Sequence, residues 1–78
     1  MPPIREAPVE MARRHVREQQ ERIERLAANI EEMNAAGLKT SELERLLRIQ
    51  EGLLELLYEH VKRWEQLDLS YGRRHAAD

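Results

Sequence analysis

The chain contains no cysteine and no phenylalanine, and aromatic residues make up only 4% of its 78 residues. The absence of cysteine excludes disulfide bonds and thiolate zinc sites as a way to stabilise a small fold. A chain of this length buries only about 60–65% of the surface of its unfolded state, so a single hydrophobic core seldom stabilises it unaided. Self-association is the remaining common source of stability.

A large net charge, long apolar runs and targeting signals are also absent. Thirteen Lys and Arg against fifteen Asp and Glu give a net charge of −2, which disfavours nucleic-acid binding. Charges interrupt every apolar stretch well before the about 20 residues that a membrane span needs, and the N-terminus lacks the apolar core of a signal peptide. We expect no nucleic-acid partner, no membrane partner and a cytoplasmic location.

Proline is confined to the first eight residues, which leaves the rest of the chain free to form helices. Pro8 suits the first position of a helix, where its missing N–H has no cost. From Val9 onward, apolar residues recur at alternating spacings of three and four, which predicts a helix with one apolar seam. This seam consists of Val9, Ala12, Val16, Gln19, Ile23, Leu26, Ile30 and Met33, with Gln19 as a polar layer.

A turn is predicted where glycine follows this helix. Gly37 suits the position after a helix end, because glycine adopts positive φ without a steric penalty. Ser41 and Glu44 then match a capping box, with Thr40 as an alternative N-cap. An end and a start so close together predict an all-α fold, an antiparallel two-helix hairpin. The predicted segments are an extended arm at 1–7, helices at 8–36 and 41–67 joined by a turn at 37–40, and a flexible tail at 68–78.

The second predicted helix carries two apolar seams, which point about 100° apart and together cover about 200° of its circumference. The first seam consists of Leu43, Leu47, Gln50, Leu54, Leu57, Val61 and Trp64. The second seam consists of Leu46, Ile49, Leu53, Leu56, His60 and Leu67. One antiparallel neighbour covers about half of this arc, so the first helix can bury only one seam.

The register of the hairpin predicts which seam is buried. Pairing across so short a turn requires the numbers of facing residues to sum to about 77. Ile23 then faces Leu54, and small Ala12 faces bulky Trp64, so the first seam packs against the first helix. Burying the four Leu and Ile side chains of the second seam up to Leu56 is worth about 6–12 kcal/mol gross per chain. We therefore predict that the second seam is the interface of a homodimer, a four-helix bundle of two hairpins.

The side chains that could carry chemistry match no established site. His15 and His60 are expected nearly level with each other, close to Glu18 and Glu59, but their spacing matches no metal-binding motif. Paired carboxylates need a concave, desolvated pocket to act as acid and base, and two thin helices offer none. We expect no catalytic, cofactor-binding or metal site and no small-molecule substrate.

Two functions stay open at this point. The first is a non-enzymatic self-associating interaction or structural module. The second is a small regulator or adaptor that binds a helix of another protein through the face formed by Leu46, Ile49, Leu53 and Leu56. Gly52 lies beside this face, where it either permits a close helix crossing or is a tolerated flanking residue.

Several sequence elements between residues 13 and 61 occur in a characteristic order. They are His15-Val16, Arg22-Ile23, Ile30, the turn from Gly37 to Thr40, Leu46-Leu47, Glu51, Leu54 and His60. In this order they resemble short uncharacterised bacterial proteins, mostly hypothetical proteins of alphaproteobacteria, that form a single helical hairpin. The resemblance implies the hairpin fold and brings no activity or site residues with it.

Overall fold

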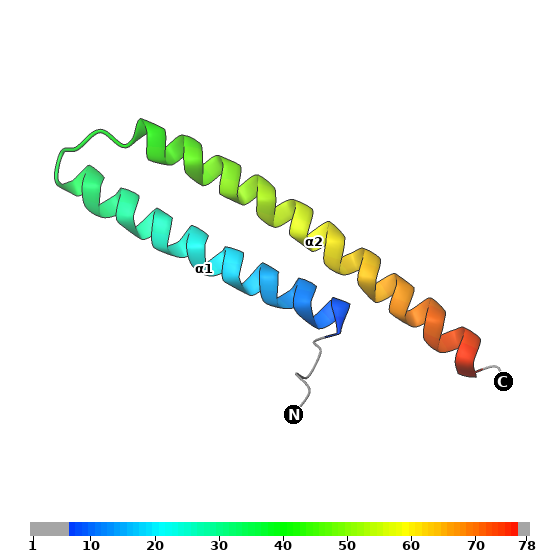
Figure 1. The fold of residues 1–78 in the computed structure, drawn as a ribbon. Helices are drawn as coiled ribbons and strands as arrows, with labels where there is room; N and C mark the ends of the chain where they lie inside the picture. The colour runs from blue at the N-terminus through cyan, green and yellow to red at the C-terminus, as the bar shows by residue number, and fades with distance from the viewer. Residues whose placement is uncertain (1–6, 77–78) are drawn as a thin grey trace, which may run out of the picture.

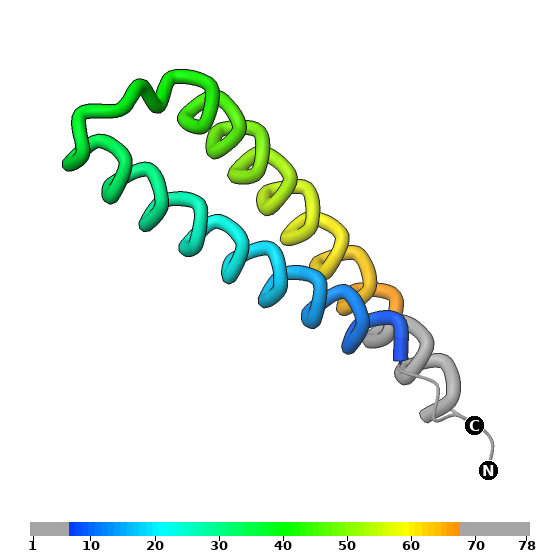
Figure 2. The backbone as a smooth tube through the Cα atoms, turned by 60° about the vertical axis from the view of Figure 1, so that its left-hand side comes forward, coloured from blue at the N-terminus to red at the C-terminus, as the bar shows by residue number. Residues whose placement is uncertain are grey.

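The computed structural model describes the backbone of residues 7–76 and the side chains of residues 7–67. Two helices, α1 (Pro8–Ala35) and α2 (Ser41–Ala76), run antiparallel and side by side, as Figures 1 and 2 show. The predicted all-α hairpin is confirmed, and no residue of the described chain lies in a strand. Neither of these helices, over the residues described, has the length of apolar sequence needed to cross a membrane.

α1 begins at Pro8 without a side-chain cap. Ala7 precedes the helix in an extended conformation, with φ −62° and ψ 146°, and its carbonyl accepts a hydrogen bond from the Met11 N–H at 2.9 Å. Glu10 lies in the first turn, where the positive end of the helix dipole favours a carboxylate. The preceding residues 1–6, which the sequence assigns to an arm, lie outside the described part of the chain.

α1 ends in a Schellman motif centred on Gly37, which has a φ of +77°. The Gly37 N–H donates to the carbonyl of Asn34, and the Leu38 N–H donates to the carbonyl of Met33, both at 3.0 Å. These bonds satisfy carbonyls that the helix end leaves without partners. The glycine therefore ends the helix for the reason that the sequence predicts.

Thr40, rather than Ser41, stands at the N-cap position of α2. The helix begins at Ser41, and the Thr40 carbonyl accepts the first helical bond from the Glu44 N–H at 2.8 Å. The buried Thr40 hydroxyl donates to Oδ1 of Asn34 at 2.8 Å, which joins the start of α2 to the end of α1. The structure thus favours the alternative N-cap over the capping box at Ser41.

α2 extends farther than the sequence predicts. It ends at Ala76, nine residues beyond the expected end at 67, so helix replaces most of the expected tail. No proline interrupts this stretch, and Gly72 costs a helix only about 1 kcal/mol, so nothing in the local sequence forces an end. Residues 77–78 of the expected tail lie outside the described residues.

The core between the helices is thin. Its buried apolar residues among those described are Ala12, Val16 and Ile30, all on α1. The radius of gyration is 18.4 Å, against about 12 Å for a compact domain of this length, and the shortest dimension is 14 Å. Since one helix with its side chains is about 10–12 Å across, the molecule is a single layer of two helices.

A polar layer crosses the core near its middle. Gln19 is only 3% exposed, and its Nε2 donates to both the backbone carbonyl of Gln50 at 2.9 Å and Oε1 of Gln50 at 2.6 Å. Two further pairs join the helices: Gln20 donates to the Tyr58 hydroxyl at 2.5 Å, and Arg13 lies 3.4 Å from Glu65. The residue numbers of each of these two pairs sum to 78, close to the expected 77. Those of the buried Gln19–Gln50 pair sum to 69, so the polar layer departs from the expected register.

Candidate interaction surface

The second seam of α2 remains exposed along its whole length. The exposed fraction is 40% for Leu46, 56% for Ile49, 44% for Leu53, 66% for Leu56 and 59% for Leu67, and His60 is also exposed. Every member of the first seam is half-buried instead. The structure therefore brings the predicted site residues together on one helix, on a face that α1 leaves open.

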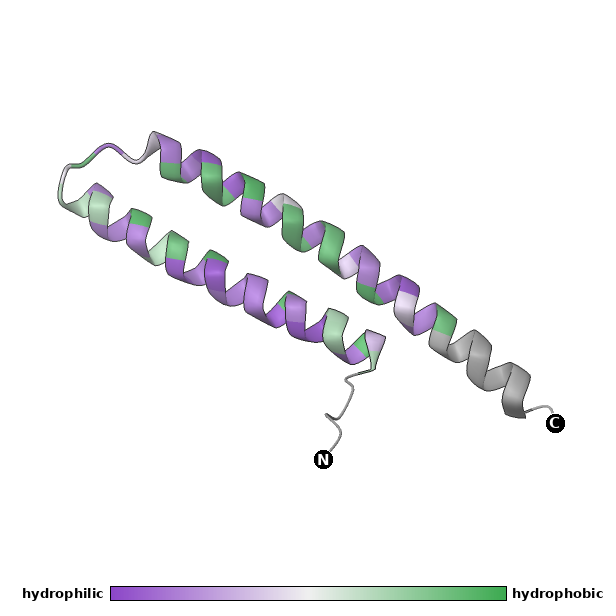
Figure 3. Ribbon diagram, viewed as in Figure 1, coloured by the Kyte–Doolittle hydropathy of each residue, from purple (hydrophilic) through white to green (hydrophobic). Residues whose placement is uncertain are grey.

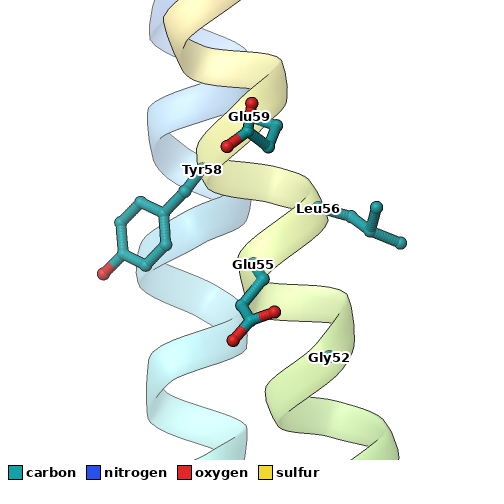
Figure 4. Close-up of a pocket in the computed structure, with 5 residues that line it drawn as sticks. All are labelled: Gly52, Glu55, Leu56, Tyr58 and Glu59. Atoms are coloured by element: carbon teal, nitrogen blue, oxygen red, sulfur yellow. The ribbon is translucent and has the colours of Figure 1, made fainter.

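Figure 3 shows where apolar residues lie along α2, and Figure 4 shows the orientation of Leu56 on this face. Apolar residues form broad bands across the middle of α2 in Figure 3. In Figure 4 the Leu56 side chain points away from α1, whereas Tyr58 extends from the opposite side of the helix over α1. Leu56 and its seam neighbours are thus available to a helix that approaches α2 from outside the hairpin.

Gly52 creates a hollow beside the second seam. A Cβ atom built at Gly52 would meet nothing within 4 Å, so no contact inside the hairpin requires glycine there. A shallow depression, open to solvent, is lined by Gly52, Glu55, Leu56, Tyr58 and Glu59. Because glycine costs about 1 kcal/mol relative to alanine within a helix, the lone hairpin gives no reason for its presence.

His60 is held by a neighbour from the first seam. Its Nε2 accepts a hydrogen bond from Trp64 Nε1 at 2.9 Å, and the two rings pack edge to face with centroids 6.0 Å apart. The Trp64 indole N–H can only donate, so Nε2 of His60 is the acceptor of this bond. His60 is therefore oriented by Trp64, and it forms part of the exposed surface of the second seam.

The other chemistry-bearing residues do not assemble into a site in the described part of the chain. No group of three or more His, Cys, Asp or Glu residues among those described is placed to hold a metal ion. Among the described residues, Glu18 is half-buried and the other carboxylates are exposed. Glu18 and Glu59 make ion pairs with Arg14 and Lys62 on their own helices. These pairs occupy solvent-exposed positions, where each contributes little to stability.

Tyr58 was not anticipated from the sequence. It is 42% exposed and lies on the side of the first seam opposite the second seam, where it bonds to Gln20. The sequence could have placed Tyr58 there, because Tyr58 follows Leu57 of the first seam and lies seven residues after Glu51 on the same edge of the helix.

Comparison with known proteins finds no matching family model, no matching curated protein and no matching solved structure.

Proposed function

We propose that the protein is a non-enzymatic, self-associating helical module, in which the second seam of one hairpin packs against a second copy to form a four-helix bundle. One observation carries this proposal: α1 covers the first seam, and the second seam, equally rich in leucine, remains exposed. The cytoplasmic location expected from the sequence is part of the same proposal.

The energy available at the second seam supports an interface. About half of each residue remains exposed at Leu46, Ile49, Leu53 and Leu56. Covering that remaining half is worth about 3–6 kcal/mol per chain, which is less than the sequence alone suggests because the hairpin already shields part of each side chain. The gain is still large beside a core with three buried apolar residues among those described.

The shape of the hairpin supports the same conclusion. Domains normally bury their apolar faces between at least two layers of secondary structure. This molecule is one layer, 14 Å in its shortest dimension, and its second seam is exposed, with Leu56 pointing away from α1 in Figure 4. A second hairpin supplies the missing layer without any further sequence element.

A helix of a different protein is the alternative occupant, and the two possibilities differ in the behaviour of the purified chain. Sedimentation equilibrium of the isolated protein should give about twice the 9.3 kDa mass of one chain. Leu53→Glu places a charge in the centre of the second seam and should give the mass of one chain. Met11→Glu is the matched control, because Met11 is exposed to a similar extent, 40%, but belongs to neither seam.

The outcomes separate the two possibilities. A dimer that Leu53→Glu dissociates and Met11→Glu preserves supports self-association through the second seam. A wild-type chain that sediments as a stable monomer at every concentration contradicts it and favours the alternative. A dimer that survives Leu53→Glu also contradicts the proposal, because its interface must then lie elsewhere.

A further inference from the structure

The charges beside the second seam are arranged in a self-complementary way. Arg45, Gly52 and Glu59 follow one another at intervals of seven residues, so they share the flank of the second seam that faces away from the first seam. Within the described residues Arg45 makes no ion pair, and Glu59 makes only a long, exposed one of 3.7 Å to Lys62. A positive charge and a negative charge thus lie equally far from the glycine, on opposite sides of it.

We infer that two copies pack their α2 helices antiparallel, about a two-fold axis that passes close to Gly52; this inference rests on the proposed self-association. In that arrangement, residues of the Gly52 flank face each other when their numbers sum to 104, and residues of the second seam face each other when their numbers sum to 102. Arg45 therefore faces Glu59 of the partner subunit, and the symmetry forms this pair twice. Gly52 faces the partner's Gly52, where the absence of side chains lets the two helices approach closely.

A parallel arrangement makes no use of these charges. In parallel packing, the outer flank of one helix faces the inner flank of the other, which holds Leu43, Gln50, Leu57 and Trp64 of the first seam. Arg45 and Glu59 would then face uncharged residues that are already packed against α1. The antiparallel arrangement pairs the outer flanks of the two helices, so Arg45 faces Glu59 of the partner subunit, and it places their apolar inner flanks beside each other.

The second seam also fits the antiparallel arrangement. Leu46 and Ile49 of one copy interleave with Leu56 and Leu53 of the other, so the four central side chains form continuous layers. His60 then faces Glu42 of the partner subunit, at each end of the contact. Leu67 projects about 9 Å past the first residue of the partner's α2, so it contributes least of the second seam.

Reversal of the paired charges tests the orientation. Arg45→Glu or Glu59→Arg alone turns two attractive contacts of the dimer into repulsive ones, and each should raise the dimer Kd about tenfold at low salt. The double variant R45E/E59R should return Kd to within about threefold of the wild type. Glu51→Arg is the matched control, because it makes the same charge change on the opposite side of α2 and should leave Kd unchanged. Single variants without effect, or a double variant without recovery, overturn the antiparallel arrangement.

Cross-linking distinguishes failure of this inference from failure of the proposed function. The chain has no native cysteine, so Leu46→Cys and Leu56→Cys each introduce a unique thiol. In the antiparallel dimer the two copies of either position lie about 15 Å apart along the axis, too far for a disulfide, whereas position 46 meets position 56. An equal mixture of the two variants in a glutathione redox buffer should therefore cross-link, and neither variant should cross-link alone.

Each other result has one meaning. Cross-linking of Leu46→Cys alone shows parallel packing, which overturns the antiparallel inference while the proposed function stands. A sample that has dimeric mass but forms no disulfide in any mixture places the interface away from the second seam. Monomeric mass together with no disulfide overturns the proposed function itself.

Discussion

The two seams of α2 are alike in composition and differ in what covers them. Both consist mainly of leucine at alternating spacings of three and four. The first seam is half-buried throughout because α1 lies against it, and the second seam is exposed throughout because α1 does not cover it. The exposure of a seam therefore depends on whether another helix covers it and not on its own side chains. The seam itself can be recognised from the sequence before the covering helix is known.

The seams also differ in how their register is specified. The first seam contains Gln50, which receives two hydrogen bonds from the buried Gln19, and a displaced register would leave these groups without partners. The second seam has no such layer at its centre. In the proposed antiparallel dimer, its register is specified instead by Gly52 and by the charged residues of its flank, Arg45 and Glu59.

The largest expected effect comes from placing the same charge in each seam. Leu54→Glu puts a carboxylate in the half-buried first seam, and we expect it to lower the free energy of unfolding by more than about 3 kcal/mol. Leu53→Glu puts it in the exposed seam, where it should act on dimer formation. Urea denaturation followed by circular dichroism should therefore show unfolding of Leu54→Glu at every protein concentration.

The concentration dependence is the decisive measurement for this pair. Loss of a dimer contact lowers stability most at concentrations where the wild type is associated. The difference in the free energy of unfolding between Leu53→Glu and the wild type should therefore shrink on dilution. The substitutions are chemically identical and adjacent, so this contrast reports geometry rather than lost hydrophobicity. Equal destabilisation of both variants at all concentrations would show that α2 has one broad core and not two seams.

The next largest effect is expected at the polar layer. Gln19→Ala removes both hydrogen bonds to Gln50 and opens a space in the core, so we expect a loss of about 2–3 kcal/mol in the free energy of unfolding. Gln50→Ala should cost less, because Gln19 keeps its bond to the backbone carbonyl at position 50. A double-mutant cycle measures the coupling, and an interaction energy near zero would contradict the role of this layer.

Much of the fold could be predicted from residues whose effect is local. The spacing of apolar residues predicted both helices, and Gly37 predicted the end of the first, because a positive φ is a local requirement. The N-cap was less certain, since Ser41 and Thr40 both suit the position. Thr40 takes it in the structure, where its hydroxyl bonds to Asn34, and that contact depends on where the reversed chain brings α1.

The sequence predicts which residues form the exposed second seam, but it does not show what binds there. The division between Leu53 and Leu54 follows from helical periodicity, and the structure reproduces it in the exposure of the two seams. The far end of α2 was not predicted, because residues 68–76 carry no apolar period to mark a helix. What covers the second seam lies outside one chain, so neither periodicity nor the hairpin alone supplies it.

A smaller effect is expected at the turn that aligns the first seam. Thr40→Val removes the hydroxyl that donates to Asn34 and keeps the shape of the side chain, so we expect a loss of about 1–2 kcal/mol. Asn34→Ala should cost a similar amount, and the double variant little more than either. Additive losses in chemical denaturation would show that the two side chains act independently and that the bond contributes nothing.

The smallest effect is expected at Gly52. A substitution there should change the stability of the hairpin and the stability of the dimer in opposite directions. A methyl group added there meets nothing within 4 Å in the hairpin, and alanine favours a helix over glycine by about 1 kcal/mol. Gly52→Ala should therefore stabilise the lone hairpin. The same methyl group should hold two copies apart at the proposed crossing, so the variant should have a more stable helix and a weaker dimer.

Two backgrounds separate these opposing effects. In the Leu53→Glu background, where the proposed dimer is absent, Gly52→Ala should raise helicity and the urea midpoint. In the wild-type background it should raise the dimer Kd severalfold in sedimentation equilibrium, because each added methyl group meets its own copy across the axis. If Gly52→Ala raised the urea midpoint and also lowered the dimer Kd, no close crossing would occur at Gly52. The glycine would then be only a tolerated flanking residue.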